Sequence, residues 1–137
     1  MTKQNRVKQF VPSLLLIGFT ALMFVFQIYL PNRKINDVTW QEKATVEELR
    51  ELSHKVLSFP IGNHHDAFMI LERVGNKDSI PYLISGLKWQ NETNEGIITC
   101  EKSCCLKALK KLTGEDVGLS YENWKKWWDS QRNRKKE

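Results

Sequence analysis

An uninterrupted run of 21 uncharged residues, from Phe10 to Leu30, is the feature that most constrains this chain. Because an α-helix rises about 1.5 Å per residue, a helix of this length covers roughly 30 Å, which matches the hydrocarbon core of a bilayer. Basic side chains stand on both sides of the run, at Lys8 and Arg33. The sequence therefore predicts a transmembrane anchor over residues 10–30, preceded by a basic tail over residues 1–9.

A cleaved signal peptide is the alternative interpretation of the same run. The apolar part of a signal peptide is typically about 7–15 residues long, and small residues follow it at the cleavage site. Here the run is longer, and the bulky side chains of Phe26, Ile28 and Tyr29 occupy its end. We therefore expect an anchor that stays attached to the chain.

The orientation of the anchor depends on the basic residues near its two ends. Three Lys/Arg residues precede the run and three follow it by residue 43, so the positive-inside rule gives almost no preference. The free amino group adds positive charge to the first side. We therefore expect a single-pass protein with its amino terminus in the cytoplasm and residues 31–137 on the extracytoplasmic side. The three cysteines form no disulfide framework, which argues against the extracytoplasmic side, because oxidising compartments favour paired cysteines.

The net charge of +5 belongs entirely to the start of the chain. Residues 1–35 contain five Lys/Arg residues and no acidic residue, so the remaining chain holds 16 basic against 16 acidic residues. A neutral domain lacks the broad basic surface that attracts nucleic acids, and we expect no nucleic-acid partner. The roughly 100 residues after the anchor are enough for one small domain.

The segment after the anchor is polar and begins with Pro31. Proline has no backbone N–H and clashes with the preceding helical turn. We therefore expect the anchor helix to end at Pro31 and residues 31–38 to form a linker to a helical domain over residues 39–130. A charged tail is predicted over residues 131–137.

Apolar residues in the domain recur at intervals of three and four, which is the spacing of amphipathic helices, and strand-like alternation is missing from the sequence. The sequence therefore predicts an all-α domain. One apolar face of its first helix is expected to hold Val46, Leu49, Leu52, Val56 and Leu57. Thr45 and Glu48 have the spacing of a capping box at the first helix. Gly75 is expected to end the second helix in a left-handed conformation, and Gly114 to end the fourth. The predicted helices cover about residues 45–58, 64–74, 79–89, 100–112 and 120–130.

Residues 90–99, with the sequence QNETNEGIIT, are polar and contain a glycine. This composition is typical of a surface loop, and loops often carry binding residues. We therefore interpret the segment as the longest loop of the domain and as a candidate contact loop.

Two segments of the domain resemble HEAT-like repeat proteins. They are AFMILERVGNKDSIPYL at residues 67–83 and CLKALKKLTG at residues 105–114. The ending LTGEDVG, followed by Trp124 and the pair Trp127-Trp128, is similar to the terminal cap of small bacterial HEAT-repeat proteins. The likeness covers about residues 64–130.

The resemblance implies a short right-handed stack of about five helices whose exposed face binds other proteins and carries no chemistry of its own. The chain holds only one full hairpin and one half repeat of this pattern, whereas repeat stacks usually need about three units to bury a continuous core. The helix at residues 45–58 and the tryptophan-rich helix are therefore expected to act as end caps.

Cysteine and histidine residues suggest a possible metal or thiol site. Cys100 and Cys104 lie one helical turn apart, while Cys105 belongs to the apolar face. Adjacent His64 and His65 point about 100° apart on a helix and do not form the pair at i and i+4 that metals favour. A site that combines one of them with Cys100 and Cys104 can be drawn, but no Cys-x-x-Cys or His-x-x-x-His motif supports it.

Free cysteines are most often small buried residues, and we expect that role for all three thiols. The sequence contains no Gly-rich phosphate loop and no Gly-x-Ser-x-Gly motif. A cysteine nucleophile would need a nearby histidine, and the spacing selects no such pair. We therefore expect no catalytic residue, no metal ion and no cofactor, and the chain is predicted not to be an enzyme.

Tryptophans form the candidate interaction surface of the domain, namely Trp89, Trp124, Trp127 and Trp128. The last three share one face of a helix, where they either cover the open end of the core or stay available for binding. The sequence thus predicts a non-enzymatic, membrane-tethered helical repeat module that binds an unknown protein partner. One alternative is a cell-envelope glycan-binding module that stacks sugar rings on Trp124, Trp127 and Trp128. Another is a thiol or metal site at Cys100 and Cys104.

Overall fold

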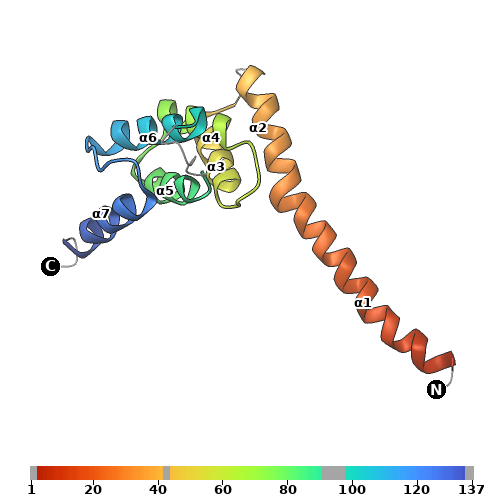
Figure 1. Ribbon diagram of the computed structural model, residues 1–137. Helices are drawn as coiled ribbons and strands as arrows, with labels where there is room; N and C mark the ends of the chain where they lie inside the picture. The colour runs from red at the N-terminus through yellow and green to blue at the C-terminus, as the bar shows by residue number, and fades with distance from the viewer. Residues whose placement is uncertain (1–2, 42–43, 91–97, 135–137) are drawn as a thin grey trace.

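The computed structural model describes residues 3–41, 44–90 and 98–134, and all the regular secondary structure in these ranges is helical. The predicted all-α class is therefore confirmed for the described residues. Figure 1 shows one long helix at the amino terminus that runs away from a group of shorter helices, with the last helix projecting from that group on the side away from α2. In chain order the elements are α1 (Lys3–Phe24), the π-helical turn η1 (Val25–Tyr29), α2 (Leu30–Gln41), α3 (Val46–Leu57), α4 (His64–Val74), the 3-10 turn η2 (Lys77–Ser79), α5 (Ile80–Lys88), α6 (Cys100–Thr113) and α7 (Tyr121–Arg134).

The elements α1, η1 and α2 follow one another without a break and form the long helix. Its apolar part, Pro12–Asp37, spans 26 residues, and its most apolar window is not buried against the rest of the protein. By length and composition this helix can cross a membrane, although a signal sequence near an amino terminus can have the same length and composition.

The prediction that Pro31 ends the long helix is wrong, because α2 continues through residues 31–38 to Gln41. A π-helical turn directly precedes the proline, and in it the N–H of Leu30 donates to the carbonyl of Val25, five residues earlier. This wider turn gives room to a proline ring that an α-helical turn would exclude. The side-chain amide of Asn32, the residue after the proline, also donates to the carbonyl of Ile28 at 2.8 Å.

Residues 31–38 are therefore not a free linker, because α2 packs directly on α3 and α4. Ile35 is fully buried in the core of the domain, and Pro31 is buried as well. The backbone N–H of Asn63, at the start of α4, donates to Oδ1 of Asn32 at 2.6 Å, and its side-chain amide donates to Asn36. These contacts fix the position of the long helix relative to the domain.

Local signals in the sequence set the starts of the domain helices. The predicted capping box at Thr45 is confirmed: Oγ1 of Thr45 accepts from the N–H of Glu48, and the Glu48 carboxylate accepts from the N–H of Thr45. Asn63 caps α4 by accepting from the N–H of Asp66 at 3.2 Å. Thr99 caps α6 in the same way through the N–H of Lys102.

Glycines directly follow α4 and α6, and their backbone conformations differ. Gly114 follows α6 with φ of 75° and confirms the expected stop. Gly75 does not adopt the left-handed conformation that we expected, because its φ is −63° and its ψ is 158°. A Cβ atom at this position would lie 2.3 Å from the carbonyl oxygen of Leu71, so the glycine is required by a close approach.

The core lies among α3, α4, α5 and α6, with α4 in contact with both α3 and α6, while α2 adds the buried side chain of Ile35 and α7 adds that of Trp124. The predicted apolar faces supply most of it, but Val46 stays 45% exposed, and Phe68 and Ile35 are core residues that the helical spacing did not indicate. The buried apolar side chains are Ile35, Leu52, Val56, Leu57, Ala67, Phe68, Ile70, Leu71, Ile80, Leu83, Ile84, Leu87, Cys105, Leu106, Ala108, Leu109 and Trp124.

Candidate functional site

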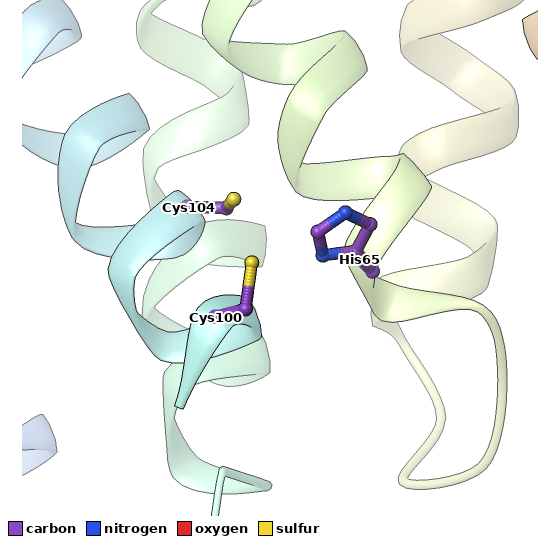
Figure 2. A group of neighbouring side chains, drawn as sticks. All are labelled: His65, Cys100 and Cys104. Atoms are coloured by element: carbon purple, nitrogen blue, oxygen red, sulfur yellow. The ribbon is translucent and has the colours of Figure 1, made fainter. Parts of the chain in front are cut away.

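A cluster of one imidazole and two thiols lies between α4 and α6. His65 comes from the first turn of α4, while Cys100 is the first residue of α6 and Cys104 follows one turn later. The cap at Thr99 places Cys100 at the helix start, and the spacing of four residues puts Cys104 on the same face. Figure 2 shows both thiols on adjacent turns of α6, across a narrow gap from the ring of His65.

The three potential ligand atoms of the cluster lie within 4.8 Å of one another. Zn–S bonds of about 2.3 Å and Zn–N bonds of about 2.0 Å would place tetrahedral ligand atoms roughly 3.5–4 Å apart. An ion would therefore require the side chains to rotate toward one another. Cys100 is exposed, and His65 and Cys104 are partly exposed, so the cluster is accessible from solvent.

The Cys100 thiol acts electrostatically on the neighbouring Cys104. Burial of Cys104, and next the neighbouring Cys100 thiol, raise the pKa of Cys104, whereas the positive charge of Lys107 acts in the opposite direction. The raised pKa favours the protonated thiol form of Cys104. A bound metal ion supplies the positive charge that stabilises the thiolates.

Cys105 differs from the other two cysteines, as its position on the apolar face predicted. Its side chain is fully buried, and its Sγ donates to the carbonyl oxygen of Leu83 at 3.2 Å. Burial raises the pKa of Cys105 far above its usual range. Cys105 is therefore an unreactive core residue.

The structure also distinguishes the adjacent histidines. His64 is 5% exposed, and its Nε2 lies 2.9 Å from the carbonyl oxygen of Phe59, while its Nδ1 lies 3.4 Å from the side-chain nitrogen of Gln90. In the Nε2–H tautomer, Nε2 donates to the carbonyl of Phe59 and Nδ1 accepts from the amide of Gln90. Both ring nitrogens of His64 are therefore engaged in contacts within the domain. His65 is the histidine that faces the thiols.

A second pairing that resembles catalytic chemistry joins His54 and Ser79, with Nε2 2.8 Å from the hydroxyl oxygen. Ser79 is fully buried and no substrate reaches its hydroxyl. The ring of His54 stacks on Tyr82 at a centroid distance of 4.1 Å. Burial, and next the charge of Arg50, lower the pKa of His54. This pair connects α3 to the turn before α5.

The tryptophans of α7 are brought together, but they are not equally accessible. Trp124 is fully buried, and its indole N–H donates to the carbonyl of Gly118 at 2.9 Å. Trp127 meets Trp124 edge to face at 5.7 Å, and Trp128 lies 6.1 Å from Trp127. Trp127 and Trp128 are partly exposed, so they remain available for contact.

Trp127 and Trp128 line a surface groove of about 280 Å³, which we call the Trp groove. Its other lining residues are Lys77, Ile80, Leu112, Thr113, Glu115, Gln131 and Arg132. Trp89 follows the last residue of α5, whereas Ile80 in the groove is the first residue of that helix, and Lys88 lies over the Trp89 ring at 5.0 Å. The four tryptophans therefore do not line one groove.

The predicted contact loop falls mostly on residues 91–97, which lie outside the described residues. Its first residue, Gln90, is buried beside His64. The sequence placed the two thiols on one helix face, but it could not choose between His64 and His65, because that choice depends on how α4 packs against α6.

Comparison of the chain with protein-family models, with curated proteins and with solved structures found no match. The resemblance to HEAT-like repeat proteins therefore stays a prediction.

Proposed function

We propose that this protein is a membrane-anchored helical module that binds a partner protein through the Trp groove. The long helix spans the membrane with its amino terminus in the cytoplasm, and the domain lies at the opposite surface. The partner supplies a large apolar side chain next to a carboxylate. The observation that carries the proposal is a groove with partly exposed tryptophans at the end of the domain away from α2.

Membrane attachment is supported by apolar surface that the fold leaves uncovered. Leu15, Ile17 and Phe19 on α1 are each at least 60% exposed. Large apolar side chains along a helix of this length are favourable in a lipid core. Phe59, in the segment before α4, also lines an apolar crevice together with Met23 near the end of α1. A bilayer around α1 would cover these surfaces.

The shape and chemistry of the groove favour a protein side chain as its ligand. The groove, at about 280 Å³, is at the lower end of the size of small-molecule sites, and a single large side chain can fill it. Ile80 and Leu112 add apolar surface to the two indole rings, and this combination suits an apolar anchor residue. Among the described lining residues, Arg132 and Lys77 outnumber the one acidic residue, Glu115, so the groove has a positive balance that favours a neighbouring carboxylate.

A glycan ligand is less well supported by this geometry. Stacking of sugar rings needs flat aromatic faces that are open to solvent, and Trp124 has no exposed surface. The rings of Trp127 and Trp128 are inclined at 31° to each other and do not form one flat platform. We therefore favour a protein ligand, and a glycan adduct in the crosslinking experiment would contradict the proposal.

Site-specific photo-crosslinking tests the proposal in the intact protein. A photoreactive amino acid at Gln131, in the groove, is expected to give a discrete adduct in native membranes, and one at exposed Lys107 on α6 is not. The substitution Arg132→Glu should reduce the Gln131 adduct several-fold. The proposal fails if both positions give the same products, if Arg132→Glu has no effect, or if the adduct resists protease and is cleaved by glycosidases. A reporter fused to the carboxyl terminus tests the predicted side of the membrane.

A further inference from the structure

We propose that His65, Cys100 and Cys104 bind one metal ion of the zinc class, and that this ion connects the first turn of α4 to the first turn of α6. The site shares no residue with the Trp groove. The metal site therefore goes beyond the proposed protein interaction, and its test does not depend on that interaction.

The ligand types select the class of metal. Thiolate and imidazole ligands suit Zn²⁺ and Cu⁺, whereas Mg²⁺ and Ca²⁺ prefer oxygen ligands, which the cluster does not contribute. Three protein ligands leave one position of a tetrahedral ion for a water molecule or for an external donor. The site therefore has the ligand number of a zinc centre with an open position.

Metal binding at this site replaces protons on the two thiols by the metal ion. Each thiol loses its proton when its sulfur bonds to the metal, so one Zn²⁺ ion releases two protons from Cys100 and Cys104. His65 binds through a ring nitrogen of its neutral form. No electron is transferred, so no oxidant or reductant takes part in the step.

A disulfide between the two thiols is the main chemical competitor. Disulfides need Cβ atoms about 3.5–4.5 Å apart, while residues at i and i+4 of an α-helix have Cβ atoms about 5–6 Å apart. Residues 100–113 form a regular helix, so a bridge would distort its first turn. A metal ion with bonds of about 2.3 Å to each sulfur fits the same two positions without that distortion.

The position of the cluster indicates what the ion does to the fold. His65 is two residues after Asn63, which bonds to Asn32 and Asn36 of α2. An ion at His65 therefore links α6 to the part of α4 that already holds the long helix. We expect metal binding to raise the thermal stability of the domain.

Cobalt titration of the reduced, full-length protein in detergent tests the proposal. One equivalent of Co²⁺ should produce thiolate-to-cobalt charge-transfer bands together with the strong visible bands of tetrahedral cobalt. One equivalent of Zn²⁺ should displace it and raise the melting temperature. Each of the variants His65→Ala, Cys100→Ser and Cys104→Ser should weaken binding at least tenfold.

Cys105→Ala is the matched control, because it removes the neighbouring thiol that points into the core. It should keep the cobalt spectrum and the stoichiometry, even where the lost side chain lowers the melting temperature. The proposal is overturned if the reduced protein gives no thiolate bands, if Cys105→Ala loses them as fully as Cys104→Ser does, or if the three ligand variants bind Co²⁺ as tightly as the unsubstituted protein. Circular dichroism confirms that each variant is folded.

Discussion

The two ends of the domain differ in how completely their side chains are buried and hydrogen-bonded. At the end that meets α2, Ile35 is fully buried and Asn32 hydrogen-bonds to both Ile28 and Asn63. At the other end, Trp128 and Arg132 line an open groove. Packing therefore occupies the end beside the long helix and leaves apolar surface at the far end. This difference shows that the first end holds the long helix, and it is the basis for proposing that a partner binds at the second end.

The largest effect is expected for Trp124→Ala, which tests whether α7 belongs to the core. Replacing a buried tryptophan by alanine typically costs about 3–5 kcal/mol, and Trp124 is fully buried and hydrogen-bonded. Denaturant unfolding followed by circular dichroism measures the loss. Trp128→Ala is the matched control and should cost clearly less, because Trp128 is partly exposed. Equal costs for the two variants would remove the distinction between core and groove within α7.

Ile35→Ala tests the other end of the domain. Removal of a fully buried isoleucine is expected to lower the free energy of unfolding by about 2–5 kcal/mol. The control is Ile61→Ala, because Ile61 is 65% exposed and should lose little stability. Thermal unfolding of the full-length protein in detergent provides the comparison. If Ile35→Ala is as mild as its control, α2 does not pack on the domain.

Gly62→Ala tests a single contact at the end of the domain beside α2, the one between Gly62 and Asn32. The added Cβ would lie 2.5 Å from Oδ1 of Asn32, which accepts from Asn63. We expect a loss of about 1–3 kcal/mol, as for other overpacked sites. Measured in an Asn32→Ala background, Gly62→Ala should cost less, because the clashing atom is absent and only the strain of a side chain at a φ of 159° remains. Additive costs would show that Gly62 and Asn32 do not contact each other.

The smallest effect concerns pH and involves His54. Its folded pKa is below the usual value of 6.5, mainly through burial and next through Arg50, although Asp78 and Glu51 oppose the shift. Below about pH 6.5 the unfolded chain binds the proton first, so stability should fall as the pH is lowered toward the folded pKa. His54→Gln should have a flatter dependence of melting temperature on pH between about 5 and 7. An unchanged slope would contradict this assignment.

Much of the domain follows from local patterns in the sequence. Leu52, Val56 and Leu57 form the predicted buried face of α3, Thr45 forms its cap with Glu48, and Cys105 is in the core as its spacing indicated. These features depend on helical periodicity and on side chains within one turn of each other. Such information is fully contained in neighbouring residues.

The remaining features depend on contacts between helices, which spacing does not encode. Pro31 continues the long helix because a π-helical turn and packing against α3 accommodate its ring. His65 rather than His64 faces the thiols because of how α4 lies on α6. Trp124 is buried while Trp128 lines a groove, although both share one helix face. Each of these outcomes is set by a partner distant in the sequence.

A distance measurement between the long helix and the domain tests their fixed arrangement most directly. Spin labels carried by unnatural amino acids at the exposed positions Asp37 on α2 and Lys107 on α6 leave the native cysteines untouched. For the full-length protein in lipid bilayers, we expect one narrow distribution of distances, because Ile35 and Asn32 hold α2 against the domain. A broad distribution, of the kind produced by a flexible tether, would contradict that arrangement.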